Sequence, residues 1–384
     1  MKKEDYYIDL ILNKCLSFEK TNSLLISYNY FNERFVQKII SKLPEKVTDI
    51  YLDCNEPFYE HELLSTLTRE EIENCKYFND GIYNKYAKKK ACFLFLVSPV
   101  PGLMNDIDDE KLATVSKIKS ESKKYFINKE TSFAFPWAIV PVYNEYWEES
   151  LDINNLEEIL YDICLVNKNS NNNWDKQITK SNKLVNKLNE LQLDSLLFQN
   201  AKGTNLKVGL SKWYRFEGIG ETDVLANLPS YEVFTSPDKN LTEGIVYSSK
   251  PLFYNGAIID EFWVEFKDGK AINYKAKKGE KMLDYIINYD EGSSFLGEVA
   301  LVENDSPISK TGIVFKTTLL DENASCHIAL GRGYGDGSKK TLEKRGINFS
   351  GIHVDFMFGT DDMKVLGLKG KEEILIMDNG KFLL

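Results

Sequence analysis

The sequence predicts two folds in succession: an α/β domain built on a parallel sheet, then a mostly antiparallel, barrel-like β domain. Up to about residue 210, short apolar runs alternate with amphipathic stretches, as strands and helices do in β-α-β order. After that point, short strand-like runs are separated by Gly, Pro, Asn and Asp turns, which is typical of antiparallel β proteins. We therefore place the domains at residues 1–210 and 211–384 of this 384-residue chain.

Strands and helices alternate in the first predicted domain. Apolar side chains recur three and four positions apart in residues 32–43, which indicates a helix. Residues 91–98 read ACFLFLVS and are apolar on both faces, as expected of a central parallel strand. By these criteria the predicted strands are residues 23–28, 48–53, 91–98 and 133–140, and the predicted helices are residues 32–43, 109–126, 153–166 and 175–193. An Asn-rich loop, residues 167–173, joins the last two helices.

Short strands dominate the second predicted domain. Residues 244–248, 262–266 and 374–377 are predicted strands, and the last two precede the turn sequences DG and DNG. We expect helices near residues 280–288 and 321–330; in the latter, Asp321 can cap the helix and Gly331 can end it.

Composition excludes several classes of partner. With 48 basic and 58 acidic residues, the formal charge of −10 repels nucleic-acid phosphates. No run of 18 apolar residues is present, so we expect no membrane span. The first residues, MKKED, lack the apolar core of a signal peptide. The six cysteines are scattered without a C-x-x-C pair, as is typical of reduced thiols. We therefore expect a cytoplasmic protein.

Histidine is scarce, and only His61, His327 and His353 occur. His61 lies in the sequence EHELLS, where Ser65 replaces the second histidine of a zinc-binding H-E-x-x-H motif. We therefore interpret His61 as a surface residue. His353 and Asp355 are different, because alternate residues of a strand share a face. Among apolar neighbours such a pair is costly unless a cation compensates the charge, although a His–Asp hydrogen bond on a wet strand face is the alternative.

Three further polar residues stand in apolar surroundings. Glu298 lies in the sequence FLGEVALV, and Glu232 lies in PSYEVFT. Charged residues at core-like positions are usually paired or bind metal, so a buried salt bridge is the alternative for each. His327 lies within the predicted helix near residues 321–330, where a packed histidine is the alternative.

Taken together, these residues suit a pair of divalent ions. Two glutamates, one histidine and one His-x-Asp offer the nitrogen and oxygen ligands that Zn²⁺, Co²⁺ or Mn²⁺ accept. Three carboxylates carry enough negative charge to hold two such ions close together. Because metal pairs of this kind activate a water molecule, the residues favour a hydrolase.

The same residues carry a resemblance to the aminopeptidase T-like metalloaminopeptidases, also called the thermophilic metalloprotease family. The matching stretches are NLPSYEVFTSP (227–237), LGEVALV (296–302), SPI (306–308), DENASCHIALG (321–331) and IHVDFM (352–357). Their order and spacing match throughout residues 203–361, whereas the first half of the chain matches in pattern only. Two positions depart from the family: Asn205 stands where Asp is usual, and residues 335–337 read GDG.

The resemblance implies an enzyme that removes the N-terminal residue from short peptides and forms a homodimer around an enclosed cavity. It implies that two metal ions are bound by Glu232, Glu298, His327, His353 and Asp355, with Tyr334 as a further site residue. In such a site we expect Glu298 or Glu232 to move a proton and the hydroxyl of Tyr334 to stabilise the negative carbonyl oxygen of the transition state. A metal-dependent hydrolase of another amide or ester, and a noncatalytic or cofactor-binding relative, are the alternatives.

Overall fold

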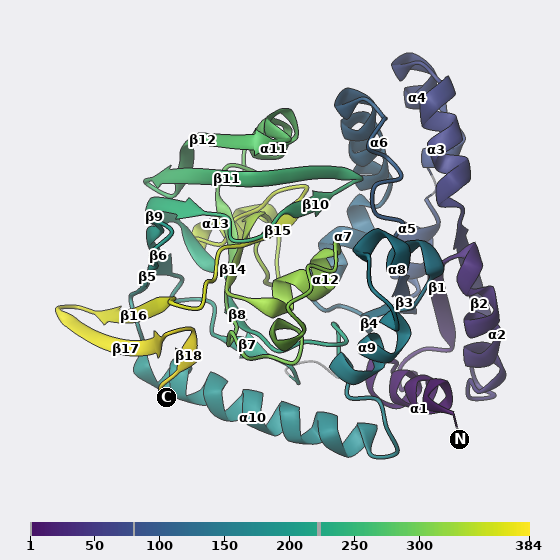
Figure 1. The fold of residues 1–384 in the computed structure, drawn as a ribbon, viewed down its shortest axis with the longest axis horizontal. Helices are drawn as coiled ribbons and strands as arrows, with labels where there is room; N and C mark the ends of the chain where they lie inside the picture. Colours follow the sequence, from purple (N-terminus) through teal and green to yellow (C-terminus); the bar gives the residue numbers. More distant parts are fainter. Residues whose placement is uncertain (1, 80, 221–223) are drawn as a thin grey trace. The chain divides into compact units, whose positions relative to one another are not determined.

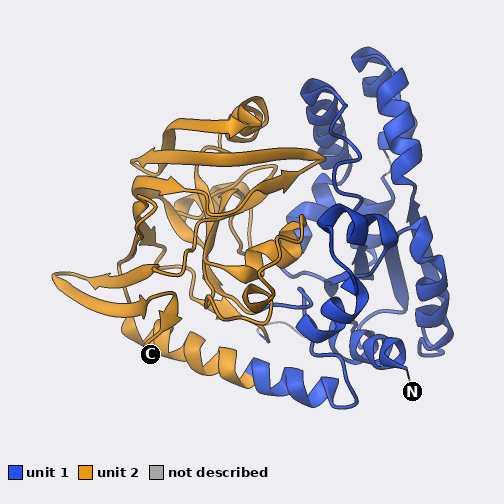
Figure 2. Ribbon diagram, viewed as in Figure 1, with its two compact units in different colours: residues 1–178, 220–230 blue, residues 179–219, 231–384 orange. Residues whose placement is uncertain are grey.

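The computed structural model describes residues 2–79, 81–220 and 224–384, and the chain forms two compact units (Figures 1 and 2). Unit 1 comprises Met1–Ile178 and Gly220–Ser230, and unit 2 comprises Thr179–Ile219 and Tyr231–Leu384. The chain passes from one unit to the other inside helix α10 (Ser170–Leu191). This division does not coincide with the predicted domain boundary near residue 210.

Unit 1 is built on a parallel sheet, as the alternating pattern predicts. Its strands are β1 (Ser23–Asn29), β2 (Asp49–Asn55), β3 (Cys92–Val97) and β4 (Trp137–Pro141), in the order β2-β1-β3-β4. All three pairings are parallel. Phe93 and Leu94 of β3 are fully buried, which explains why that strand is apolar on both faces.

Helices connect these strands. They are α1 (Lys3–Leu10), η1 (Ile11–Cys15), η2 (Tyr30–Asn32), α2 (Glu33–Ser41), α3 (Pro57–Thr66), α4 (Arg69–Asn74), η3 (Lys76–Phe78), α5 (Ile82–Lys88), α6 (Asp109–Ser122), α7 (Lys124–Glu130), α8 (Glu145–Leu151) and α9 (Leu156–Ile163). The predicted helix at residues 109–126 is therefore two helices that meet at Lys123. The predicted strand at 133–140 starts only at Trp137, because Phe133 adopts a positive φ of 49°. The predicted loop at 167–173 is shorter, since α10 begins at Ser170.

Unit 2 contains two antiparallel sheets. The nine-stranded sheet consists of β5 (Ser195–Gln199), β6 (Asn205–Leu210), β9 (Pro237–Tyr247), β10 (Leu252–Tyr254), β11 (Ala257–Lys267), β12 (Lys270–Lys278), β16 (Lys364–Lys369), β17 (Glu372–Asp378) and β18 (Lys381–Phe382). Its order is β10-β11-β9-β6-β5-β16-β17-β18, and β12 pairs with β11. Gly269 forms the β11–β12 turn at φ +80°, where a Cβ atom would lie 1.7 Å from the carbonyl oxygen of Lys239.

The five-stranded sheet carries the residues of interest. Its strands are β7 (Glu217–Gly218), β8 (Val233–Thr235), β13 (Leu296–Leu301), β14 (His327–Gly331) and β15 (His353–Met357), in the order β15-β14-β13-β8-β7. Across the described residues neither antiparallel sheet closes on itself, so the predicted barrel-like shape is not confirmed. No helix in the described ranges is long and apolar enough to cross a membrane.

The predicted helix at residues 321–330 is wrong. Helix α12 (Thr318–Asp321) and the helical turn η5 (Glu322–Ala324) end before His327, which begins strand β14. Pairing with β13 on one side and β15 on the other overrides the local helical signal. Asp321 does act locally, because its carboxylate accepts hydrogen bonds from the backbone N–H groups of Phe315 and Thr317. The remaining helices of unit 2 are α11 (Glu280–Ile287), η4 (Ser309–Thr311) and α13 (Lys339–Lys344), and α11 agrees with the helix predicted near 280–288.

Candidate metal centre

Strand register brings the predicted ligands to one face of the five-stranded sheet. Glu298 of β13 lies opposite Ala329 of β14, and Ala329 lies opposite Asp355 of β15. Residues directly opposite one another share a face, and so do residues two apart on a strand. His327 and His353 therefore join this face. The methyl group of Ala329 leaves the space between the two carboxylates open.

Glu232 reaches the same face from the neighbouring strand. It immediately precedes β8, and Phe234 of β8 lies opposite Ala300 of β13. Because Ala300 is two residues from Glu298, Phe234 and Glu232 point toward the same side as Glu298. Five residues that are up to 123 positions apart in sequence, Glu232 to Asp355, thus converge through antiparallel pairing.

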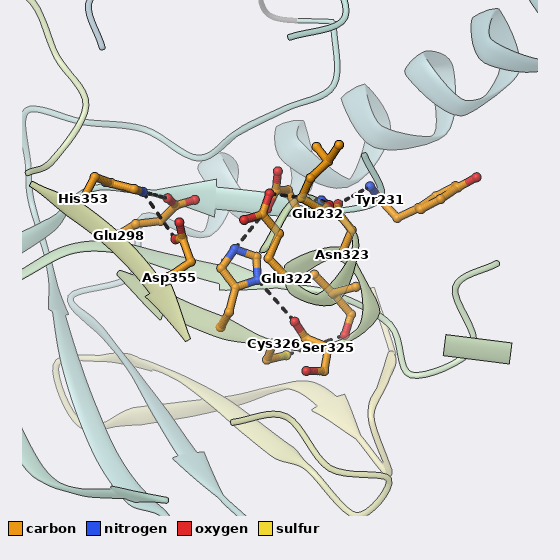
Figure 3. A network of polar contacts seen from close by, with 12 residues as sticks. Tyr231, Glu232, Glu298, Glu322, Asn323, Ser325, Cys326, His353 and Asp355 are labelled. Atoms are coloured by element: carbon orange, nitrogen blue, oxygen red, sulfur yellow. Dashed lines mark hydrogen bonds and ion pairs between the residues drawn. The ribbon is translucent and has the colours of Figure 1, made fainter. Parts of the chain in front are cut away.

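These side chains form two groups of three. Ligand atoms of Glu232, Glu298 and His327 lie within 4.8 Å of one another, and so do those of Glu298, His353 and Asp355. His327 Nε2 is 3.1 Å from Glu232 Oε2, and His353 Nε2 is 3.1 Å from Glu298 Oε2 and 3.3 Å from Asp355 Oδ1. Figure 3 shows His353 facing both of its partners. Glu298 belongs to both groups.

Hydrogen bonds fix which nitrogen of each imidazole faces the carboxylates. His327 Nδ1 lies 3.2 Å from the carbonyl oxygen of Ser325, and His353 Nδ1 lies 2.6 Å from that of Arg332. A carbonyl oxygen only accepts, so each Nδ1 carries the hydrogen. Each Nε2 therefore has a lone pair available when the ring is neutral, which is how histidines that bind metals are oriented.

The first group is buried, so the negative charges of its carboxylates need a positive charge nearby. Glu232, Glu298 and His327 are almost completely buried. Burial raises the pKa of the Glu298 carboxyl to about 7. For His327, burial alone would lower the pKa, but the hydrogen bond to Glu232 and the surrounding carboxylates raise it to about 10. In the metal-free protein a protonated histidine thus offsets the carboxylates, a task that a divalent cation performs equally well.

The second group also fits a cation. Its residues are more accessible, with 22% of the His353 side chain and 12% of the Asp355 side chain exposed. The Oδ1 atom of Asp355 is nevertheless buried, and it has no well-directed hydrogen bond within the described part of the chain. Burial would raise the pKa of Asp355, but the charge of His353 lowers it, so this oxygen remains an anionic acceptor. An anionic oxygen beside an available Nε2 is a suitable pair of ligands for a divalent ion.

Tyr334 lies against the second group. Its ring centroid is 5.3 Å from that of His353 and 5.1 Å from that of Phe234. Its backbone is held on both sides, because its N–H donates to Ser236 Oγ and its carbonyl oxygen accepts from the same hydroxyl. Burial and the charges of Glu298 and Asp355 raise the pKa of Tyr334 well above its ordinary value. The phenol therefore stays protonated and can donate a hydrogen bond.

Glu322 is the functional candidate that the sequence does not single out. It lies in η5, is buried, and appears beside the same cluster in Figure 3. Burial, followed by the charges of Asp355 and Glu232, raises its pKa well above its ordinary value. Its neighbour Asn323 accepts a hydrogen bond from the Tyr231 N–H at 2.7 Å, next to Glu232. The signal used for Glu298 is absent here, because Glu322 stands between the polar residues Asp321 and Asn323 and interrupts no apolar run.

His61 belongs to neither group. It lies in α3 of unit 1, where its Nε2 is 2.9 Å from Asp106 Oδ1. A partly exposed His–Asp pair of this kind needs no metal ion. The sequence predicts a surface residue here, and 24% of the His61 side chain is exposed.

Metal binding to the metal-free protein is expected to release protons and to tighten as the pH rises. With a pKa of about 10, His327 carries a competing proton on Nε2 at neutral pH, and a metal binds only after that proton leaves. Lowering the pH through about 7 also protonates Glu298 and weakens binding further. Calorimetric titrations in buffers of different ionisation enthalpy measure the release. Binding that is independent of pH between 7 and 9 would contradict this assignment of the protons.

Comparison with known proteins identifies the family of the chain. The thermophilic metalloprotease (M29) family profile matches residues 1–382. Aminopeptidase AmpS of Bacillus subtilis (strain 168) is 36% identical over 75% of each chain, and Aminopeptidase 2 of Geobacillus stearothermophilus is 28% identical over 97% of this chain and 96% of its own. The structure of wild-type AmpT from Thermus thermophilus superposes with a TM-score of 0.86 at 28% identity, covering 100% of this chain and 99% of that one.

Proposed function

Because the chain belongs to the thermophilic metalloprotease (M29) family, it is a metal-dependent aminopeptidase, and we propose that it works with two divalent cations. The first ion is held by Glu232, Glu298 and His327, and the second by Glu298, His353 and Asp355. The observation that carries this proposal is the membership of Glu298 in both groups of ligand atoms. A carboxylate has two oxygens and can bind one ion with each. Zn²⁺, Co²⁺ and Mn²⁺ all accept this mixture of imidazole and carboxylate ligands.

When bound, such ions polarise a carbonyl group and make a water molecule acidic near neutral pH. A carboxylate of the chain would then accept the proton that this water molecule releases. The sequence assigns this role to Glu298 or Glu232, but both are proposed ligands. Glu322 lies outside both groups and is buried beside them, and burial raises its pKa, which makes its carboxylate a better proton acceptor, so we add it to the candidates.

The remaining parts of the proposal concern the substrate. A free N-terminal amine can bind a metal ion or an acidic side chain, whereas an acetylated one cannot. The proposed ligands and Tyr334 all lie within residues 211–384, the predicted catalytic domain. Short peptides are the proposed substrates, and Tyr334 is the proposed donor to the carbonyl oxygen of their first peptide bond.

The test of this function is removal and return of the metal. Dialysis against a chelator is expected to abolish release of the first residue from short peptides, and Zn²⁺, Co²⁺ or Mn²⁺ is expected to restore it. The matched substrate is the same peptide with an acetylated N-terminus, which should remain uncut. Activity that survives complete metal removal would refute the proposal, and preferential cleavage of blocked amides or esters would assign a different hydrolase.

Assembly and location complete the proposal. Family membership supports a homodimer, which is expected to give twice the chain mass of 44.1 kDa by light scattering at micromolar concentration. A stable monomer would refute the dimer and leave the chemistry unaffected. All six cysteines are free thiols, which supports a location in the cytoplasm.

A further inference from the structure

We infer that Asn348 is a positioning residue for the second metal group, acting through the backbone carbonyl that orients His353. This inference rests on the proposed function, since it concerns the group formed by Glu298, His353 and Asp355. Asn348 lies between α13 and β15, is 1% exposed, and is absent from both groups of ligand atoms.

The amide of Asn348 faces backbone carbonyl groups. Its Nδ2 donates to the carbonyl oxygens of Gly292 at 2.7 Å, Phe295 at 3.3 Å and Gly331. An oxygen in that position would repel all three acceptors, so this orientation of the amide is settled by its surroundings. The Oδ1 atom of Asn348 is buried and has no hydrogen-bond partner among the residues that the structure describes. Nδ2 alone thus accounts for the polar contacts of this side chain.

These bonds hold a short segment from both ends. Asn348 Nδ2 binds the carbonyl of Gly331, and the backbone carbonyl of Asn348 accepts from the N–H of Gly333 at 3.0 Å. Between those two glycines lies Arg332, whose carbonyl oxygen accepts from His353 Nδ1 at 2.6 Å. A single buried asparagine therefore clamps the residues on either side of the group that orients His353.

Residues 331–333 lie so close to neighbouring backbone that a Cβ atom would clash at the glycines where they meet. Gly331 has φ +99°, and a Cβ atom there would lie 2.2 Å from the carbonyl oxygen of Ile352. A Cβ atom at Gly297 would lie 2.1 Å from the carbonyl oxygen of Arg332. The backbone of residues 331–333 is thus closely packed on two sides. The Asn348 amide adds a donor to the Gly331 carbonyl at one end of this segment, whereas the carbonyls of Gly292 and Phe295 also accept from the backbone N–H groups of Phe295 and Gly331. Loss of that amide is expected to move the Arg332 carbonyl.

The first metal group does not depend on this clamp. His327 is oriented by the carbonyl of Ser325, which lies at the other end of β14. A change at Asn348 should therefore weaken the second ion selectively. Loss of an outer contact that orients a metal-binding histidine typically costs about 10- to 100-fold in metal affinity.

A matched control is present in the same loop. Ser350 is also 1% exposed, and its hydroxyl donates to Asp290 Oδ1 at 2.8 Å. The same hydroxyl accepts from the N–H of Ile352 at 3.3 Å, so Ser350 anchors the loop before β15, and neither of its bonds is made to Gly331, Arg332 or Gly333. Ser350→Ala and Asn348→Ala each remove one buried polar group, but only Asn348→Ala removes the side-chain bond to the Gly331 carbonyl. The backbone bond from the Gly333 N–H to the carbonyl of residue 348 remains in both variants.

The experiment uses the full chain and measures two quantities: the affinity for Co²⁺ and the NMR signal of the His353 Nδ1–H group. We expect the wild type and Ser350→Ala to bind two Co²⁺ ions, and Asn348→Ala to bind the second ion about 10- to 100-fold more weakly with the first unchanged. Since only three histidines are present, ¹⁵N-histidine labelling resolves the His353 Nδ1–H signal, which should broaden or disappear in Asn348→Ala alone. Asn348→Leu, which keeps the approximate side-chain volume without a donor or a charge, should behave in the same way and serves if Asn348→Ala does not fold.

Retention of the second ion and of the His353 signal in both Asn348 variants would overturn the inference. Equal losses in Ser350→Ala would also overturn it, because the effect would then come from general loosening of the loop. If the wild type binds only one ion, the two-ion proposal fails, while the histidine signal of the metal-free protein still decides the role of Asn348.

Discussion

Glu298→Gln is expected to lose both metal ions and to reduce kcat/KM by roughly 10³-fold or more, since bound metal supplies several kcal/mol of transition-state stabilisation. Glu298 is the residue shared by the two groups of ligand atoms, so its replacement removes a ligand from each ion at once. The amide keeps the size of the side chain. Because burial raises the pKa of Glu298 to about 7, a neutral group at this position should leave the metal-free fold intact.

Two further variants make this result specific. Glu232→Gln removes a ligand only from the first group, and Asp355→Asn removes one only from the second. Each is expected to retain one ion per chain, whereas Glu298→Gln retains none, as measured by elemental analysis after gel filtration. Two ions retained in Glu298→Gln would refute the shared-ligand assignment. Loss of both ions in all three variants would indicate a single coupled site.

Local sequence patterns correctly predict the features of the fold that follow from burial of side chains. A strand covered on both faces must be apolar throughout, and β3 is read correctly for that reason. The same reasoning finds the buried carboxylates, since Glu298 and Glu232 interrupt apolar runs and prove to be buried. His353 and Asp355 share a face because β15 is a strand, as the alternating pattern of residues 352–357 indicates.

Long-range pairing accounts for what the sequence does not reveal. The segment HIALG has a plausible helical cap before it and ends in a glycine, so only its partners β13 and β15 make it a strand. Glu322 interrupts no apolar run, yet it turns inward in η5. Likewise, the pairing of Glu298 with Ala329 and of Ala329 with Asp355 sets which ligands share a group. The spacing of these residues along the sequence does not predict that register.

Tyr334→Phe is expected to lower kcat about 10²-fold or more and to leave two ions bound. The substitution removes one oxygen and keeps the ring, so the packing against His353 and Phe234 is preserved. Burial and nearby carboxylates hold the pKa of Tyr334 well above its ordinary value, and its hydroxyl remains a donor across the neutral range. A donor aimed at a carbonyl oxygen gains strength as negative charge develops there, so the loss should fall on kcat more than on KM.

Tyr274→Phe is the control for removing a tyrosine hydroxyl from unit 2. The Tyr274 hydroxyl donates to Asp284 at 2.7 Å, away from both metal groups, and its loss should leave kcat and metal content unchanged. Three outcomes for Tyr334→Phe then have separate meanings. A lower kcat with both ions present identifies the oxyanion donor, and an unchanged kcat eliminates that role. Loss of an ion would instead make the phenol a metal ligand, because removing a hydrogen-bond donor to the substrate gives no reason for the metal to leave.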